Sequence, residues 1–115
     1  MVPLVRLDSL DVGDRPIALL KIDVEGYEKF VLDGATGLLS RVHCIFIETW
    51  EDHFAKYGYS CVDVHARLRA AGFHLFLFQD DRLVPVPPGY VSHQCEDVVG
   101  VRDLALFSAR TGFTM

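Results

Sequence analysis

The stretch LLKIDVEGYE, from Leu19 to Glu28, constrains this chain more than any other. It begins inside an apolar run with a single lysine, which predicts a strand from Ile17 to Asp23 that is buried on both faces. The run ends in alternating acids and a glycine, and ligands of open α/β sheets bind beyond such carboxyl ends. We therefore expect Asp23, Glu25 and Glu28 at the mouth of a crevice. The alternative is that they are ordinary helix-start acids on a solvated rim.

A helix is expected directly after this strand. Tyr27, Phe30, Val31 and Gly34 fall at positions i, i+3, i+4 and i+7, which predicts one inward-facing stripe. Gly34 is expected to end the helix in the position after its last turn, where glycine is favoured.

A second buried strand is predicted from His43 to Thr49, and it also closes on acids, beginning with Glu48. Two apolar strands joined by a helix describe a right-handed βαβ unit, whose strands end on the same rim. Asp23 and Glu48 should therefore face one crevice, with Trp50 beside them.

The rest of the chain predicts one more helix and a smaller set of strands. Ser60 and Asp63 form a capping box that opens a helix ending at Gly72. Its expected inward residues are Val62, Val64, His65, Leu68 and Ala71. Later elements are a strand from Phe73 to Phe78, an antiparallel hairpin strand from Leu83 to Val86 near a sheet edge, a long polar loop from Pro87 to Asp103, and a last strand from Leu104 to Ala109.

Composition limits the class of protein. A chain of 115 residues suits one domain, and a hydrophobic content of 50% is that of a globular protein. A net charge of −5 argues against a nucleic-acid partner, which needs a basic stripe. No apolar run approaches the ~18 residues of a membrane span, and the N-terminus does not resemble a signal peptide. We expect a cytoplasmic protein without a membrane partner, whose three cysteines are buried or capping thiols.

Four segments of the sequence carry a family resemblance. In this order and spacing they resemble the FkbM-type methyltransferases: Leu7–Leu10, Leu20–Glu28, Val31–Ala35 and Ile47–Glu48. The resemblance implies an O-methyltransferase that depends on S-adenosylmethionine and acts on a hydroxyl of a sugar or secondary metabolite. It implies a three-layer, Rossmann-like class I sheet. The strands expected from Ile17, His43, Phe73 and Leu104 would be its fourth to seventh, with the seventh antiparallel between the fifth and sixth.

The resemblance also implies roles for individual residues. Asp23 or Glu25 would be the catalytic base, and Glu48 would orient the hydroxyl or bind a cation. Cofactor contacts are expected from Asp23, Val24, Glu25 and Gly26, and substrate contacts from Trp50 and Glu28. Asp23 could instead cap the following helix. We expect no resident metal, although the three catalytic carboxylates could hold a divalent cation.

The sequence departs from the family in its first part. Its nine glycines never form the G-x-G-x-x-G pattern of a cofactor-binding turn. We therefore expect residues 1–115 to be the C-terminal half of such a domain, with one edge of the strand from Ile17 to Asp23 unpaired. An open edge favours a homodimer or a segment swap, unless Val2 to Leu7 folds back along it. The alternative function is a catalytically silent remnant that acts through self-association or partner binding.

Overall fold

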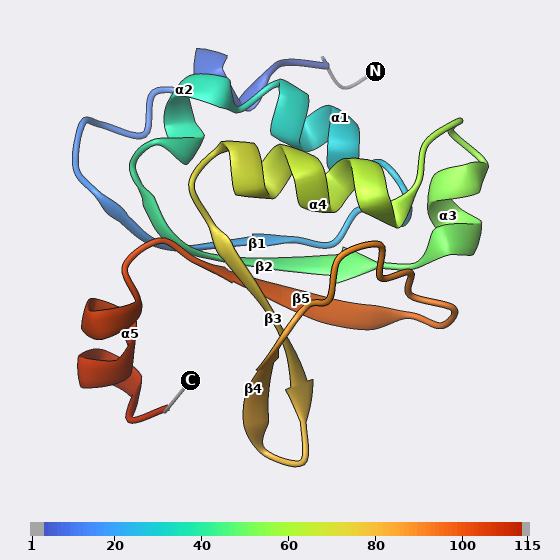
Figure 1. The fold of residues 1–115 in the computed structure, drawn as a ribbon. Coiled ribbons are helices and arrows are strands. Elements are labelled where there is room, and N and C mark those ends of the chain that lie inside the picture. The colour runs from blue at the N-terminus through green and yellow to red at the C-terminus, as the bar shows by residue number, and fades with distance from the viewer. Residues whose placement is uncertain (1–3, 114–115) are drawn as a thin grey trace.

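The computed structural model describes residues 4–113, which form an α/β fold around a five-stranded sheet (Figure 1). The spatial order of the strands is β1-β2-β5-β3-β4. The strands are β1 (Ile17–Ile22), β2 (Val42–Thr49), β3 (His74–Gln79), β4 (Arg82–Pro85) and β5 (Glu96–Val101). The helical elements are η1 (Leu7–Ser9), α1 (Glu28–Asp33), α2 (Thr36–Leu39), α3 (Glu51–Ala55), α4 (Cys61–Ala70) and α5 (Leu104–Thr111). The α/β class predicted from the sequence is confirmed.

Three strands of the sheet share one direction. β1 pairs with β2 in parallel, with Ile22 opposite Ile47. β5 is antiparallel both to β2 and to β3, so β3 runs the same way as β1 and β2. β4 forms the predicted antiparallel hairpin with β3 and lies at the sheet edge. The carboxyl ends of β1 and β2 therefore meet on one rim.

The last two elements differ from the sequence prediction. An antiparallel strand does lie between β2 and β3, but it is β5, inside the stretch expected to be a polar loop. Residues 104–109, expected to be that strand, belong to helix α5. Asp103 caps α5 by accepting from the Leu106 N–H at 3.0 Å. Gly100 fits the sheet interior because a Cβ there would lie 2.5 Å from Ile45 Cγ2.

Helices cover the two faces of the sheet unequally, which gives three layers. Helices α1, α2 and α4 pack together over one face, whereas α5 lies alone on the other (Figure 1). The larger core lies under α1, α2 and α4, and its fully buried residues include Leu32, Ile45 and Leu68. The smaller core joins Val99 and Val101 of β5 to Phe107 of α5. Strand β2 is thus held between packed layers, whereas β1, next to it, buries only Ile22.

Two expected packing faces are wrong. The stripe of Tyr27 and Phe30 in α1 is exposed at 39% and 38%, because α1 turns Glu28 and Leu32 inward instead. Strand β1 is also not buried on both faces, since Leu19 is 55% exposed. In α4 the predicted capping box is present, but the buried residue of its first turn is Cys61 rather than Val62. Gly34 ends α1 as expected, although with a right-handed φ of −84°.

The N-terminal segment does not cover the free edge of β1. Residues 4–6 belong to no strand, and η1 packs on α1 and α2, where Asp8 accepts from the Gly37 and Leu38 N–H groups at 3.0 and 2.8 Å. The expected return of this segment along β1 is therefore wrong for residues 4–7. Val2 and Pro3 of that prediction lie outside the described residues.

A single arginine joins the helix layer to the sheet. The Arg102 guanidinium donates to the carbonyl oxygens of Val42, Ala71 and Leu39 at 2.9, 2.7 and 2.6 Å. It also lies 4.5 Å from the centre of the Phe73 ring. These contacts satisfy carbonyl groups at the ends of α2 and α4, which have no partner within their own helices.

Candidate functional site

The turn between β1 and α1 has an unusual backbone. Glu25 has a φ of +52° and Gly26 a φ of +106°, both in the left-handed region. A Cβ on Gly26 would lie 2.9 Å from the His53 carbonyl oxygen and 2.9 Å from a ring carbon of Tyr57. Glycine is therefore required here both for its conformation and for the close approach of the neighbouring helix α3.

Glu28 holds this turn from the inside. Its side chain is only 1% exposed, and its oxygens accept from the Val24 N–H at 2.9 Å and the Gly26 N–H at 2.8 Å. Charge-assisted bonds to backbone donors are strong and fix the turn around them. The substrate-binding role predicted for Glu28 stays a prediction, and these contacts favour a structural role.

Tyr59, in the segment between α3 and α4, also supports this turn. Its hydroxyl donates to the Gly26 carbonyl oxygen and accepts from the Lys29 N–H at 3.3 Å. Burial, together with the nearby Glu28 carboxylate, raises the pKa of Tyr59 to about 12. No local sequence pattern predicted this role, because its partner Gly26 is thirty-three residues away in the chain.

Asp23 and Glu25, the first two acids of the turn, are exposed, and Asp23 lies beside Glu48 of β2. Asp23 follows β1 at the position that the register places opposite Glu48, directly after the Ile22 and Ile47 pair. Burial and the neighbouring Asp23 carboxyl raise the pKa of Glu48 above its usual range. The structure thus brings these two acids together, whereas Glu25 points its exposed side chain to solvent. The catalytic roles predicted for all three remain predictions.

Cys95 joins this acid pair from the loop before β5. Cys95 is exposed rather than buried as expected, but partial desolvation of its thiol and the adjacent Glu48 carboxylate raise the thiol pKa to about 11. The loop is fixed over the rim by a 2.7 Å bond between the buried hydroxyls of Thr49 and Ser92. Tyr90 adds a 2.6 Å bond from its hydroxyl to Glu96 Oε1. No local pattern signalled that Cys95 would lie beside Glu48, because that contact depends on how β5 inserts into the sheet.

Trp50 lies next to the rim as expected, but its ring already has a neighbour. The centre of the Trp50 ring lies 4.5 Å from that of His53 in α3. Its indole nitrogen is buried without a hydrogen-bond partner among the described residues. The stacking of Trp50 on a substrate ring remains a prediction.

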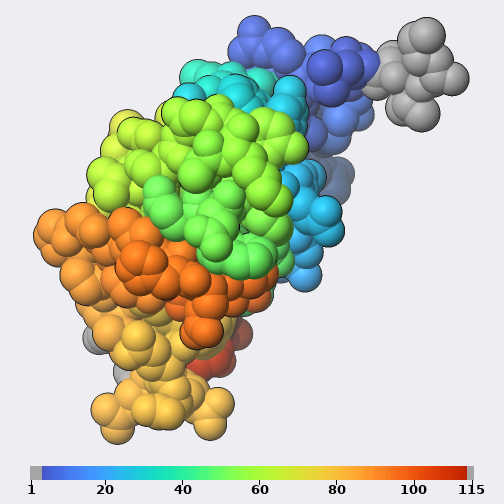
Figure 2. All heavy atoms as spheres, turned by 90° about the vertical axis from the view of Figure 1, so that its right-hand side faces the viewer, coloured from blue at the N-terminus to red at the C-terminus, as the bar shows by residue number. Residues whose placement is uncertain are grey.

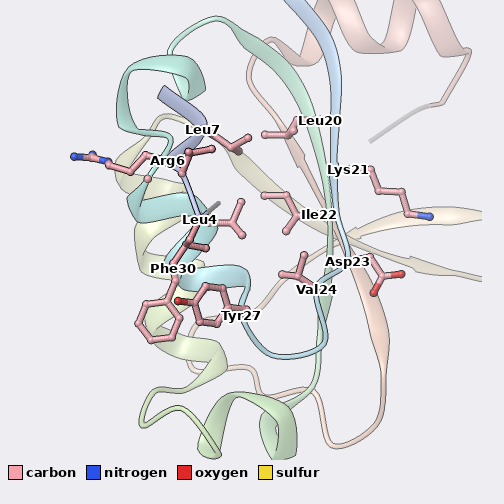
Figure 3. Close-up of a pocket in the computed structure, with 13 residues that line it drawn as sticks. Leu4, Arg6, Leu7, Leu20, Lys21, Ile22, Asp23, Val24, Tyr27 and Phe30 are labelled. Carbon is pink, nitrogen blue, oxygen red and sulfur yellow. The ribbon is translucent and has the colours of Figure 1, made fainter. Parts of the chain in front are cut away.

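An apolar groove of about 800 Å³ runs along β1 below this rim. Leu20, Ile22 and Val24 point into it toward Leu4 and Leu7, whereas Lys21 and Asp23 point away (Figure 3). Tyr27, which precedes α1, and Phe30 of α1 close its other end, with ring centres 4.6 Å apart. The outward stripe of α1 therefore forms one wall of a groove.

The rim offers acid–base chemistry beside an apolar surface. A carboxyl with a raised pKa is a stronger base than an ordinary one, and a second carboxyl can share its proton. Among residues 4–113, no group of three or more His, Cys, Asp or Glu side chains is arranged to hold a metal ion. Viewed from the carboxyl ends of β1 and β2, α3 and the loop before β5 lie close together over this end of the sheet (Figure 2).

No helix in the described part of the chain is long and apolar enough to cross a membrane.

One of three comparisons with known proteins finds a match for this sequence. Residues 1–75 match the family model of the methyltransferase FkbM domain. The matched range includes β1, the turn held by Glu28, α1 and β2, and hence both members of the acid pair. No curated protein and no solved structure matches the chain. Because the family model covers well over half of the residues, the chain belongs to the FkbM methyltransferase family.

Proposed function

We propose that this chain forms one wall of an O-methyltransferase site that uses S-adenosylmethionine and acts on a hydroxyl of a sugar or secondary metabolite. The observation that carries the proposal is the meeting of Asp23 and Glu48 at the carboxyl ends of two parallel strands. We assign β1, β2, β3 and β5 to the fourth to seventh strands of a Rossmann-like class I sheet. The antiparallel β5 between β2 and β3 supports that assignment.

The residues at the rim fit one side of the cofactor. FkbM methyltransferases generally use S-adenosylmethionine, which supplies an electrophilic methyl group on a cationic sulfur. Asp23 and Glu25 are exposed carboxylates that suit the cationic sulfur and the ribose hydroxyls. Val24 and Tyr27 give an apolar and aromatic surface next to them. The Gly26 N–H and carbonyl oxygen are already bonded to Glu28 and Tyr59, so Gly26 shapes this wall without polar contacts of its own.

Glu48 is the base in this proposal. Glu48 would take up the proton that the acceptor hydroxyl loses, and S-adenosylmethionine, when bound, would supply the methyl group. Burial and the Asp23 carboxyl keep the pKa of Glu48 raised, so that the carboxylate binds that proton more strongly than an ordinary glutamate.

Titration calorimetry of the chain with S-adenosylmethionine tests this function. We expect binding in the micromolar range, weakened at least tenfold by Asp23→Asn, which removes the carboxylate next to the cation. Asp81→Asn, in the remote turn between β3 and β4, is the matched control and should bind like the wild type. No heat up to millimolar cofactor, or equal binding by Asp23→Asn and the wild type, would contradict the proposal.

A second candidate function is a catalytically silent domain of the same family. The observation that favours it is that β1 is the edge strand, so the described residues supply acids and an apolar wall on only one side of the cofactor. An absence of heat in the titration above would favour this candidate.

We also propose a cytoplasmic location. Cys44, Cys61 and Cys95 are free thiols, which is the state that a reducing compartment maintains.

A further inference from the structure

We propose that Ser92 is a positioning residue for Glu48: it ties the loop before β5 to the last residue of β2, and so holds the Glu48 carboxylate beside Asp23. The contacts that carry this inference join β2, α3, α4 and that loop. Its consequence for methyl transfer rests on the proposed function, whereas the geometry that Ser92 imposes on Glu48 does not.

Ser92 contacts three separate elements of the fold. It is 0% exposed, and its hydroxyl lies 2.7 Å from that of Thr49, the last residue of β2. Its carbonyl oxygen accepts from the N–H of Glu51, the first residue of α3, at 2.9 Å. The thiol of Cys61, the first residue of α4, also bonds to Ser92. One buried serine thus joins the end of a strand to the starts of two helices.

The hydrogen bond between the two hydroxyls has a defined direction. The Thr49 hydroxyl carries a single proton, which it donates to the Glu96 carbonyl oxygen at 3.3 Å. Ser92 is therefore the donor to Thr49. The two bonds in series fix the buried Thr49 side chain between the loop and the start of β5, and the loss of either would leave a buried polar group with one partner fewer.

Fixing Thr49 also fixes the residue before it. Side chains alternate between the two faces of a strand. In β2, Ile47 packs in the larger core, and Thr49 shares its face, whereas Phe46 packs against the smaller core, and Glu48 shares that face. Anchoring Thr49 on one face of the sheet therefore sets the backbone from which Glu48 projects on the other.

The loop that Ser92 anchors also covers Glu48. Ionisable groups from four elements surround this carboxyl, and they are Asp23, Glu28, Cys95 and Asp97. Burial is the largest of the causes that raise the pKa of Glu48, and the bond from the Cys95 thiol lowers it. A loop that moved away would remove both effects. Because burial is the larger effect, the pKa of Glu48 should then fall.

Carboxyl-carbon NMR titration of variants at both ends of the hydroxyl bond tests this role. Ser92→Ala removes the donor, and Thr49→Val removes the acceptor but keeps the shape of the side chain. We expect the Glu48 pKa to fall toward its ordinary value of 4.5 in both variants. Thr49→Ser keeps the hydroxyl and should keep the wild-type value. The double variant should shift the pKa no further than one single variant does, because both changes remove the same bond.

Ser108→Ala, in α5 on the other face of the sheet, is the matched control. It removes a serine hydroxyl bond of the same 2.7 Å length, to the Phe113 carbonyl oxygen. The Glu48 pKa should stay raised in this variant, because the bond lies far from the loop. An equal fall in Ser108→Ala and Ser92→Ala would overturn the proposal, since any loss of stability would then act like the loss of this bond.

Calorimetry with S-adenosylmethionine separates this inference from the proposed function. A Glu48 pKa that stays raised in Ser92→Ala and Thr49→Val, with micromolar cofactor binding by the wild type, would overturn the role of Ser92 alone. A fall of that pKa in both variants, with no heat on addition of the cofactor, would support the role of Ser92 and contradict the proposed function.

Discussion

Glu25 and Glu28 lie in the same short turn and have opposite surroundings. Glu25 is exposed, whereas Glu28 is buried and binds two backbone N–H groups. The sequence predicted acids at the rim correctly for Asp23 and Glu48, because both follow long apolar strands. It could not predict the burial of Glu28, since a charged residue in a first helical turn is normally on the surface.

Replacement of the buried Glu28 should destabilise the fold. Glu28→Gln keeps one acceptor oxygen but turns an amide donor toward a backbone N–H. We expect a loss of about 2 kcal/mol in the free energy of unfolding, measured in urea. Glu25→Gln, in the same turn and exposed, is the control and should change stability by less than about 0.5 kcal/mol. Equal effects of the two variants would show that Glu28 does not hold the turn.

Gly26 should tolerate a methyl group less well than another glycine with a positive φ. Gly26→Ala adds a Cβ 2.9 Å from the His53 carbonyl oxygen, whereas Gly13→Ala, at a φ of +76°, meets nothing within 4 Å. We expect Gly13→Ala to cost about 1 kcal/mol and Gly26→Ala at least about 2 kcal/mol more. Thermal or urea unfolding of both variants measures the difference, and a similar cost would mean that α3 does not press on the turn.

At the scale of elements, the sequence predicts the first half of the fold better than the last. The predicted bounds of β1, α1 and β2 agree with the structure within one or two residues, although the inward stripe predicted for α1 is wrong. Strand β5 was missed because its apolar part, Val98 to Val101, contains a glycine and lies among polar residues. For residues 104–109 the predicted strand is wrong, and the signals for helix α5 are the cap Asp103 and the helical spacing of Leu104 and Phe107. For β5, packing in the centre of the sheet overrides a weak local preference.

Helix α4 carries a histidine that should make stability depend on pH. His65 is 2% exposed, and burial followed by the Arg69 charge lowers its pKa to about 4, whereas Glu51 and Glu96 raise it slightly. The unfolded chain, with a histidine pKa near 6.5, binds this proton more readily than the folded chain. The stabilisation is therefore complete above pH 6.5 and is lost as pH falls toward 4, by roughly 3 kcal/mol in total.

Urea unfolding between pH 4 and pH 7 measures this effect. The loss of stability in the wild type at lower pH should be larger than in His65→Leu, which cannot take up the proton. If the free energy of unfolding falls equally with pH in the two proteins, His65 does not take up a proton on unfolding.

At the scale of the whole molecule, the acid pair and the free edge both follow from the position of β1. Its parallel pairing with β2 places Asp23 beside Glu48, and among residues 4–113 no strand pairs with its other side. The sequence indicated both features, because each needs only the two apolar strands and their parallel order. Cys95 and the loop over the rim could not be predicted, since they depend on long-range packing around β5.

The pKa of Glu48 is the most direct measure of this account, and carboxyl-carbon NMR titration of the wild type and Asp23→Asn measures it. We expect Glu48 to titrate above its ordinary value of 4.5 in the wild type, because it is partly buried beside Asp23. The value should fall in Asp23→Asn, where the charge of the Asp23 carboxyl is removed and the burial of Glu48 remains. An ordinary pKa in both proteins would mean that the two carboxyls do not share a site, and it would contradict the proposed methyltransferase wall.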